Sequence, residues 1–165
     1  MFVIWFLFDK SDHEYLSSII QKLSNQYNCH SFIPHITAHG IINTNIEQID
    51  KIITDSIKGI KSFFIEKNKL TFTDNFWKTL FIDISPNQKM VEINKKLRND
   101  LPLKQDYDFS PHISLMYKKI NEKEKEKLEA TIITKNNFKI SKLGILKFSE
   151  NINEWKIIQE YSLNG

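Results

Sequence analysis

Two histidines in this chain lie in matching stretches of sequence. Residues 32–37 read Phe-Ile-Pro-His-Ile-Thr, and residues 109–114 read Phe-Ser-Pro-His-Ile-Ser. Phe, Pro, His and Ile occupy the same positions in both stretches, and each stretch ends in a short hydroxyl side chain. Because side chains alternate along a strand, the histidine and the hydroxyl two residues later would share one face. Two such strands side by side would present two imidazoles and two hydroxyls to one ligand.

These side-chain types suit attack of water on a phosphodiester. Imidazole titrates near neutral pH, so one histidine can take a proton while the other gives one. Hydroxyls donate hydrogen bonds to anionic oxygens without adding charge. We therefore interpret His35 and His112 as the candidate catalytic pair. The candidate phosphate donors are Thr37 and Ser114.

The strands and helices predicted around the two motifs come in the same order in both halves of the chain. Four pairs of residues predict helix starts, namely Ser11 with Glu14, Thr44 with Glu47, Ser85 with Gln88, and Asn121 with Glu124. The predicted strands cover residues 2–8, 31–42, 63–72, 76–85, 109–117, 139–148 and 155–163. We expect the long strand 63–72 to bend near Asn68. In each half the order is strand, helix, histidine strand, helix, strand.

The spacing of the repeats indicates an internal duplication. His35 and His112 are 77 residues apart, and so are Thr44 and Asn121. We therefore predict an α+β fold made of one domain, residues 1–165, with halves of about 1–73 and 74–165. The expected architecture is bilobal and pseudo-twofold. Two antiparallel β-sheets would flank a central cleft, with the helices outside.

Composition and charge are those of a globular protein with a small ligand. The 165 residues carry a net charge of +3, which suits a small anion better than a long nucleic-acid track. The single cysteine, Cys29, excludes an intramolecular disulfide and favours a reducing, cytoplasmic location. The apolar run at residues 1–8 is too short to span a bilayer and reads as a buried strand. We expect a monomer without a membrane partner.

Two other readings of the motifs stay open. The first is a metal site, but on an extended strand His35 and His39 would lie about 13 Å apart, too far to share one ion. The second is a non-catalytic nucleotide- or RNA-binding module, although a binder has no need of an acid–base pair. We expect neither a metal nor a cofactor. Substrate specificity would reside in loops around residues 73–79 and 102–108.

The two motifs resemble the paired H-x-T/S signature of the two-histidine (2H) phosphoesterase superfamily. The signature residues are His35-Ile36-Thr37 and His112-Ile113-Ser114, and the resemblance extends over nearly the whole chain. Within the superfamily the chain is most similar to the plant- and yeast-type cyclic phosphodiesterases, because of Trp5 in the first strand and Tyr117 after the second motif. Ala38-His39-Gly40 departs from the more apolar continuation expected there.

The resemblance implies metal-independent hydrolysis of a five-membered cyclic phosphate. The expected substrates are nucleoside 2′,3′-cyclic phosphates or ADP-ribose 1″,2″-cyclic phosphate, and Trp5 and Tyr117 would join Thr37 and Ser114 in binding them. The alternative is a phosphodiesterase acting on RNA ends, 2′,5′-oligoadenylate or cyclic oligonucleotides, because related branches share the four signature residues. The near-symmetry leaves the roles of the histidines open, and the resemblance favours His112 as base and His35 as acid.

Overall fold

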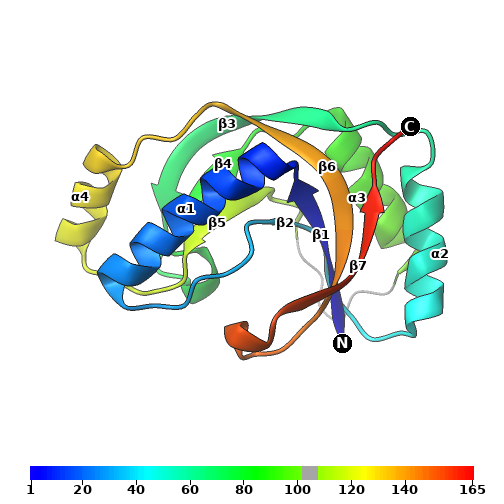
Figure 1. Ribbon diagram of the computed structural model, residues 1–165, viewed down its shortest axis with the longest axis horizontal. Coiled ribbons are helices and arrows are strands. Elements are labelled where there is room, and N and C mark those ends of the chain that lie inside the picture. The colour runs from blue at the N-terminus through cyan, green and yellow to red at the C-terminus, as the bar shows by residue number, and fades with distance from the viewer. Residues whose placement is uncertain (102–107) are drawn as a thin grey trace.

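The computed structural model describes residues 1–101 and 108–165 (Figure 1). The expected specificity loop at residues 102–108 therefore lies outside the described residues, except for Asp108. The helices are α1 (Lys10–Tyr27), α2 (Ile46–Ile57), α3 (Gln88–Asp100) and α4 (Glu122–Thr131), with short 3₁₀ helices η1 (Phe76–Lys78) and η2 (Ile152–Glu154). The strands are β1 (Phe2–Phe8), β2 (Ile36–Ile42), β3 (Phe63–Phe72), β4 (Leu80–Ile84), β5 (His112–Met116), β6 (Asn137–Lys147) and β7 (Lys156–Ser162).

The strands form one antiparallel sheet in the order β2-β1-β6-β3-β4-β5, with β7 added to β6. The α+β class is confirmed, but the expectation of two separate sheets is wrong. The six-strand order is symmetric, because exchanging β1 with β4, β2 with β5 and β3 with β6 reproduces it. The first strand of each half thus pairs with the third strand of the other half.

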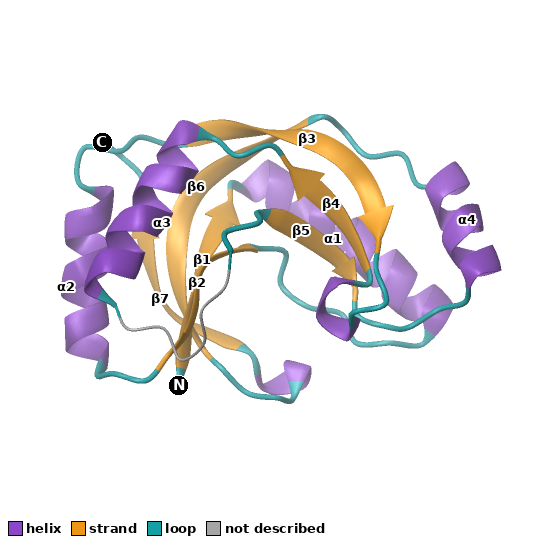
Figure 2. Ribbon diagram, turned by 180° about the vertical axis from the view of Figure 1, so that it is seen from behind, coloured by secondary structure: helices purple, strands orange, loops and turns teal. Residues whose placement is uncertain are grey.

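The long strands β3 and β6 join what would otherwise be two sheets. Residues 63–66 of β3 pair with β6, whereas residues 67–72 pair with β4. The ladder between β3 and β4 is irregular between Lys67 and Lys69, at the bend predicted near Asn68. Figure 2 shows β3 and β6 arching over the molecule, with β1–β2 and β4–β5 on either side. At this irregularity β3 changes its neighbour from β6 to β4.

The helices begin close to the predicted positions, but three of the four predicted caps are wrong. The observed N-caps are Asp9, Asn45, Asn87 and Asn121, each accepting a hydrogen bond from a backbone N–H of the first turn. Only Asn121 was expected. The other three caps lie one or two residues away from the expected ones, because an Asp or Asn within two residues of each predicted Ser or Thr caps the helix equally well.

Helix packing also crosses between the halves. Helix α1 packs against β5 as well as β1, and α3 packs against β2 and α2. The apolar faces of these helices are buried in the core, for example Leu16 of α1, Ile49 of α2 and Ile93 of α3. These helix contacts between the two halves hold the two histidine strands in one compact body. Among the described residues, no helix is long and apolar enough to cross a membrane.

Candidate active site

The two histidine motifs lead into strands that carry the same irregularity. In β2, Thr37 lies opposite Trp5 of β1, but His39 lies opposite the adjacent Ile4. One extra residue, Ala38, therefore stands between these two pairs, as in a β-bulge. The bulge breaks the alternation of faces, and His39 is fully buried. This accounts for the Ala38-His39-Gly40 departure noted in the sequence.

The second motif repeats this bulge 77 residues later. Ser114 of β5 lies opposite Phe81 of β4, but Met116 lies opposite the adjacent Leu80, so Leu115 is the extra residue. Met116 is buried at the position equivalent to His39. The two motifs thus have matching backbone registers, and in both the residue after the bulge is turned into the core.

A pocket of about 600 Å³ brings all the sequence-predicted site residues together. Residues that line it include Trp5, His35, Thr37, His112, Ser114 and Tyr117. They come from three strands or their ends, β1 and β2 on one side of the symmetric sheet and β5 on the other. Residues distant in the sequence therefore face one small cavity of the size that holds a nucleotide-like ligand.

His35 lies against the wall of this pocket. Its Nδ1 is 2.6 Å from the carbonyl oxygen of Ile33, and its ring stacks on Trp5 at 3.5 Å between centroids and 9° between planes. A carbonyl can only accept, so Nδ1 carries the proton and Nε2 is left for a ligand. Burial lowers the pKa of His35 to about 3, although the hydrogen bond to Ile33 opposes the shift. His35 is therefore neutral at pH 7.

His112 is held in the same way but in a different environment. Its Nδ1 is 2.8 Å from the carbonyl oxygen of Ser110, which again leaves Nε2 for a ligand. Its ring meets Phe81 edge to face, at 5.3 Å, instead of stacking on an indole. Burial lowers the pKa of His112, and the charge of Lys78 lowers it further, whereas the Ser110 carbonyl and Asp83 raise it. The two imidazoles are thus chemically unequal.

Trp5 and Tyr117 form apolar walls beside the histidines. Trp5 is only 2% exposed and places its ring face on His35, so it holds that imidazole in position. Tyr117 stacks on Phe32 at 4.1 Å. Burial raises the pKa of Tyr117 to about 12, although a hydrogen bond with Ser114 partly opposes the shift. Because the pKa is high, the phenol stays protonated at neutral pH and can donate a hydrogen bond.

Sequence reasoning missed Lys78 and Trp155, which line the pocket together with Trp77. A second internal repeat in the sequence would have pointed to them. Residues 73–78 read Thr-Asp-Asn-Phe-Trp-Lys, and residues 149–156 read Ser-Glu-Asn-Ile-Asn-Glu-Trp-Lys. Each is the connection after a long strand, β3 to β4 and β6 to β7, so the two loops occupy equivalent places in the symmetric sheet.

Matching hydrogen bonds build both loops. The hydroxyl of Thr73 accepts from the N–H of Asn75 at 3.2 Å, and that of Ser149 accepts from the N–H of Asn151 at 3.1 Å. Each asparagine side chain then accepts from the N–H two residues on and starts a 3₁₀ turn. Two loops with the same internal bonds therefore frame the pocket.

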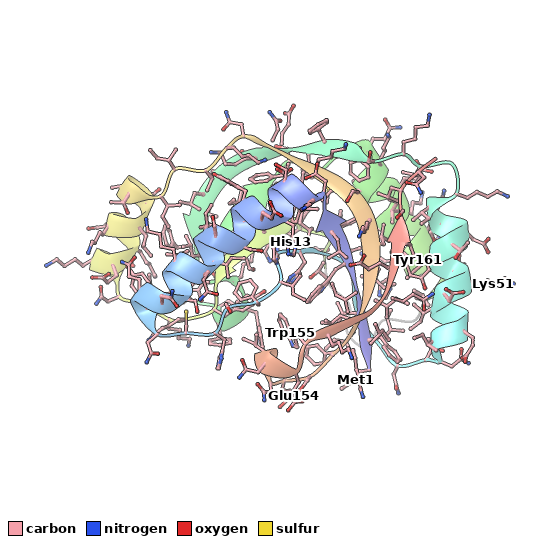
Figure 3. All side chains as sticks on the ribbon, viewed as in Figure 1. Met1, His13, Lys51, Glu154, Trp155 and Tyr161 are labelled. Atoms are coloured by element: carbon pink, nitrogen blue, oxygen red, sulfur yellow. The ribbon has the colours of Figure 1, made fainter. Side chains whose placement is uncertain are left out.

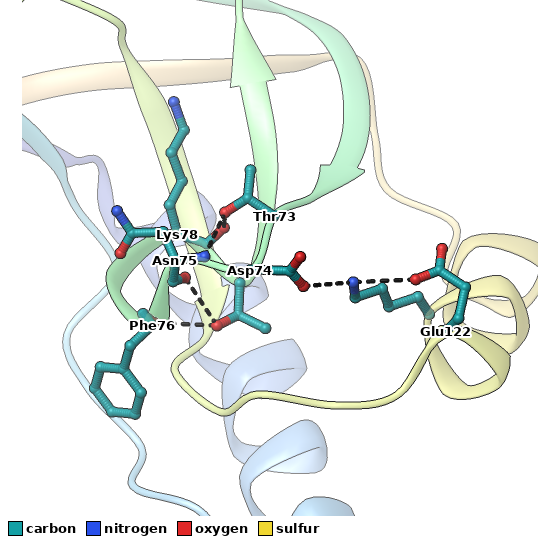
Figure 4. A network of polar contacts seen from close by, with 8 residues as sticks. Thr73, Asp74, Asn75, Phe76, Lys78 and Glu122 are labelled. Atoms are coloured by element: carbon teal, nitrogen blue, oxygen red, sulfur yellow. Dashed lines mark hydrogen bonds and ion pairs between the residues drawn. The ribbon is translucent and has the colours of Figure 1, made fainter.

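The first loop is also anchored from outside (Figure 4). The carboxylate of Asp74 pairs with Lys125 of α4 at 2.8 Å, and Lys125 also contacts Glu122 at 3.2 Å. The hydroxyl of Thr79 donates to the carbonyl oxygens of Asn75 and Phe76. Although Trp77 is 43% exposed, its backbone therefore has a defined position.

Lys78 supplies a positive charge to the pocket. Its Nζ is 3.2 Å from the Ser110 hydroxyl and 4.6 Å from the ring centroid of Phe81. A lysine in that place can offset the charge of a bound phosphate. Among residues 1–101 and 108–165, no group of three or more His, Cys, Asp or Glu side chains has the geometry to hold a metal ion.

Comparisons with known proteins identify the family of the chain. A family model described as cyclic phosphodiesterase-like protein matches residues 1–163. The cyclic phosphodiesterase of Arabidopsis thaliana is 17% identical over 173 residues, covering 99% of this chain and 96% of the relative.

Two solved structures share the fold. The LigT protein of E. coli, in complex with 3′-AMP, superposes with a TM-score of 0.66 at 8% identity, covering 99% of this chain and 98% of LigT. Usb1 of Kluyveromyces marxianus gives a TM-score of 0.51 at 12% identity, covering 99% and 96%. At these identities the likeness shows the fold alone.

Proposed function

Because the chain belongs to the cyclic phosphodiesterase-like protein family of the 2H phosphoesterase superfamily, we propose that it hydrolyses a ribose cyclic phosphate to a phosphomonoester. The substrate class is a nucleoside 2′,3′-cyclic phosphate or ADP-ribose 1″,2″-cyclic phosphate. One observation carries the proposal. The two histidines that line one pocket each donate Nδ1–H to the backbone carbonyl two residues earlier, so both leave Nε2 for a ligand.

The phosphate would lie between the two motifs. The hydroxyls of Thr37 and Ser114 donate hydrogen bonds to its free oxygens, and Lys78 offsets its negative charge. Tyr117, which keeps its proton, supports Ser114 from the pocket wall. Donors placed around the phosphorus stabilise the charge that develops on the equatorial oxygens during attack.

The two imidazoles divide the proton transfers. His35 is neutral because of its depressed pKa, so its Nε2 takes a proton from the attacking water as the water oxygen bonds to phosphorus. The ring bond from phosphorus to the departing ribose oxygen breaks, and protonated His112 gives its proton to that oxygen. Burial lowers the pKa of His112 too, but the Ser110 carbonyl and Asp83 oppose the shift and favour the protonated form. This assignment is the reverse of the one suggested by the family resemblance.

The test is incubation with a panel of phosphodiesters, followed by phosphorus NMR. The panel includes nucleoside 2′,3′-cyclic phosphates, ADP-ribose 1″,2″-cyclic phosphate, 2′,5′-oligoadenylate and cyclic oligonucleotides. We expect conversion of the cyclic monophosphates to monoesters, unchanged by EDTA. His35→Ala and His112→Ala should lose at least about 100-fold in turnover. The exposed His30→Ala variant is the matched control. Full activity in either catalytic variant would contradict the proposal.

A further inference from the structure

All three tryptophans of the chain line the pocket, and two of them face each other across it. The rings of Trp77 and Trp155, here called the tryptophan pair, lie 6.0 Å apart between centroids with 20° between their planes. They come from the two equivalent loops described above, so the pseudo-symmetric repeat supplies one indole to each side. In Figure 3, Trp155 extends from the η2 loop toward the middle of the molecule.

The two indole planes of the tryptophan pair are close to parallel, as the two faces of a base-binding clamp must be. If the pair opens, a flat base can enter between the indoles and stack on both of them. Trp155 is held by a hydrogen bond from its Nε1 to the carbonyl oxygen of Ser149, at 2.8 Å, and meets Trp5 edge to face. Trp77, which is 43% exposed, is the side that can move.

The pair also lies beside the proposed phosphate position. Trp155 is 5.9 Å from the ring of His35, and Trp77 is 5.5 Å from the ring of Tyr117. The Ser114 hydroxyl lies 3.5 Å from the backbone carbonyl oxygen of Trp77. A base held by the pair would therefore be about one sugar ring away from the phosphorus.

We propose that Trp77 and Trp155 clamp the base of a nucleoside 2′,3′-cyclic phosphate, and so make this the preferred substrate class. The inference rests on the proposed function. In a nucleoside 2′,3′-cyclic phosphate the base and the cyclic phosphate share one ribose, which matches the short separation in the pocket. In ADP-ribose 1″,2″-cyclic phosphate the cyclised ribose carries no base, and a pyrophosphate separates it from the adenine. The clamp therefore favours the nucleoside substrate.

The experiment measures kcat and KM on two substrates that differ only in the base. These are adenosine 2′,3′-cyclic phosphate and methyl ribofuranoside 2,3-cyclic phosphate. Loss of one stacking partner corresponds to about a 5- to 150-fold rise in KM. We expect Trp77→Ala and Trp155→Leu to show this rise for the adenosine substrate and no change for the base-free one. Trp77→Phe and Trp155→Phe should restore most of the affinity. Phe64→Ala, which removes an aromatic ring that is 63% exposed and does not line the pocket, is the matched control.

Separate outcomes overturn the clamp and the proposed function. Equal losses on both substrates, or no loss on either, would overturn the clamp while leaving the hydrolysis intact. If the wild-type protein turns over no cyclic phosphate, the proposed function fails, and quenching of tryptophan fluorescence by adenosine 2′,3′-cyclic phosphate then tests the clamp by itself. Quenching that survives in both Trp77→Phe and Trp155→Phe at full amplitude, or that is absent in the wild-type protein, would also overturn it. Thermal melts of each variant establish that the fold is retained.

Discussion

The unequal surroundings of the two histidines predict which one is the base. The pKa of His35 is lowered to about 3, so at pH 7 only about 10⁻⁴ of the molecules carry its proton. Using His35 as the general acid would require that minority form and would add about 5 kcal/mol to the barrier. Burial lowers the pKa of His112 as well, but the Ser110 carbonyl and Asp83 oppose that shift. A bound phosphate anion raises the pKa of both imidazoles.

Changing the leaving group separates the two roles. Glutamine at either position removes proton transfer while keeping a polar side chain of similar reach. A cyclic phosphate expels a poor alkoxide that needs an acid, whereas a p-nitrophenyl phosphodiester expels a group that does not. We expect His112→Gln to lose 10²–10⁴-fold on the cyclic substrate but less than about tenfold on the aryl ester. His35→Gln should lose 10²–10⁴-fold on both.

The assay is kcat/KM for each variant on each substrate between pH 4 and pH 9. In the wild-type protein, activity should fall as the pH rises through the pKa of His112, because the acid loses its proton, and should hold on the acid side until the pKa of His35 is approached. The mirrored pattern, in which His35→Gln is rescued by the aryl ester and His112→Gln is not, would refute the assignment and restore His112 as the base.

Three further predictions concern charge and stability. Lys78→Met should raise KM for a cyclic phosphate roughly 5- to 30-fold and move the basic limb of the pH profile upward, because Lys78 lowers the pKa of His112; an unmoved limb would contradict this. Burial lowers the pKa of His39 in the folded protein. Below about pH 6.5 the unfolded chain therefore takes up a proton at His39 that the folded chain does not. The free energy of unfolding should be highest above that pH and decline as the pH falls below it. His39→Met, which copies Met116 of the other motif, should flatten that decline in urea unfolding at pH 8 and pH 5, and an unchanged slope would count against it. Asp12 is 4% exposed and pairs with Lys135, so Asp12→Ala should cost about 3 kcal/mol of unfolding free energy, and a loss below about 1 kcal/mol would show that the pair is unimportant.

Much of the site was predictable from local sequence. The Pro-His-Ile-hydroxyl stretches identified the imidazoles and hydroxyls that line the pocket, because strand alternation is a local property of two or three residues. The helix caps were predictable only to within two residues, since neighbouring Asn, Asp, Ser and Thr compete for the same backbone N–H groups. The repeated loops at 73–78 and 149–156 were readable in principle, but a two-residue insertion before Trp155 hides the match.

By itself, the sequence determined that the chain is duplicated, which residues could do chemistry, and that the two copies would share one geometry. Only the tertiary structure decided how the copies combine. The bend in β3 merges the expected pair of sheets into one, and the bulges at Ala38 and Leu115 turn the following residues into the core. The different environments of the two histidines also arise only in the folded protein. Trp5 stacks on His35, whereas Phe81 only meets His112 edge-on. Desolvation and charge depend on neighbours that are far away along the chain, so near-identical motifs become unequal only when the chain folds.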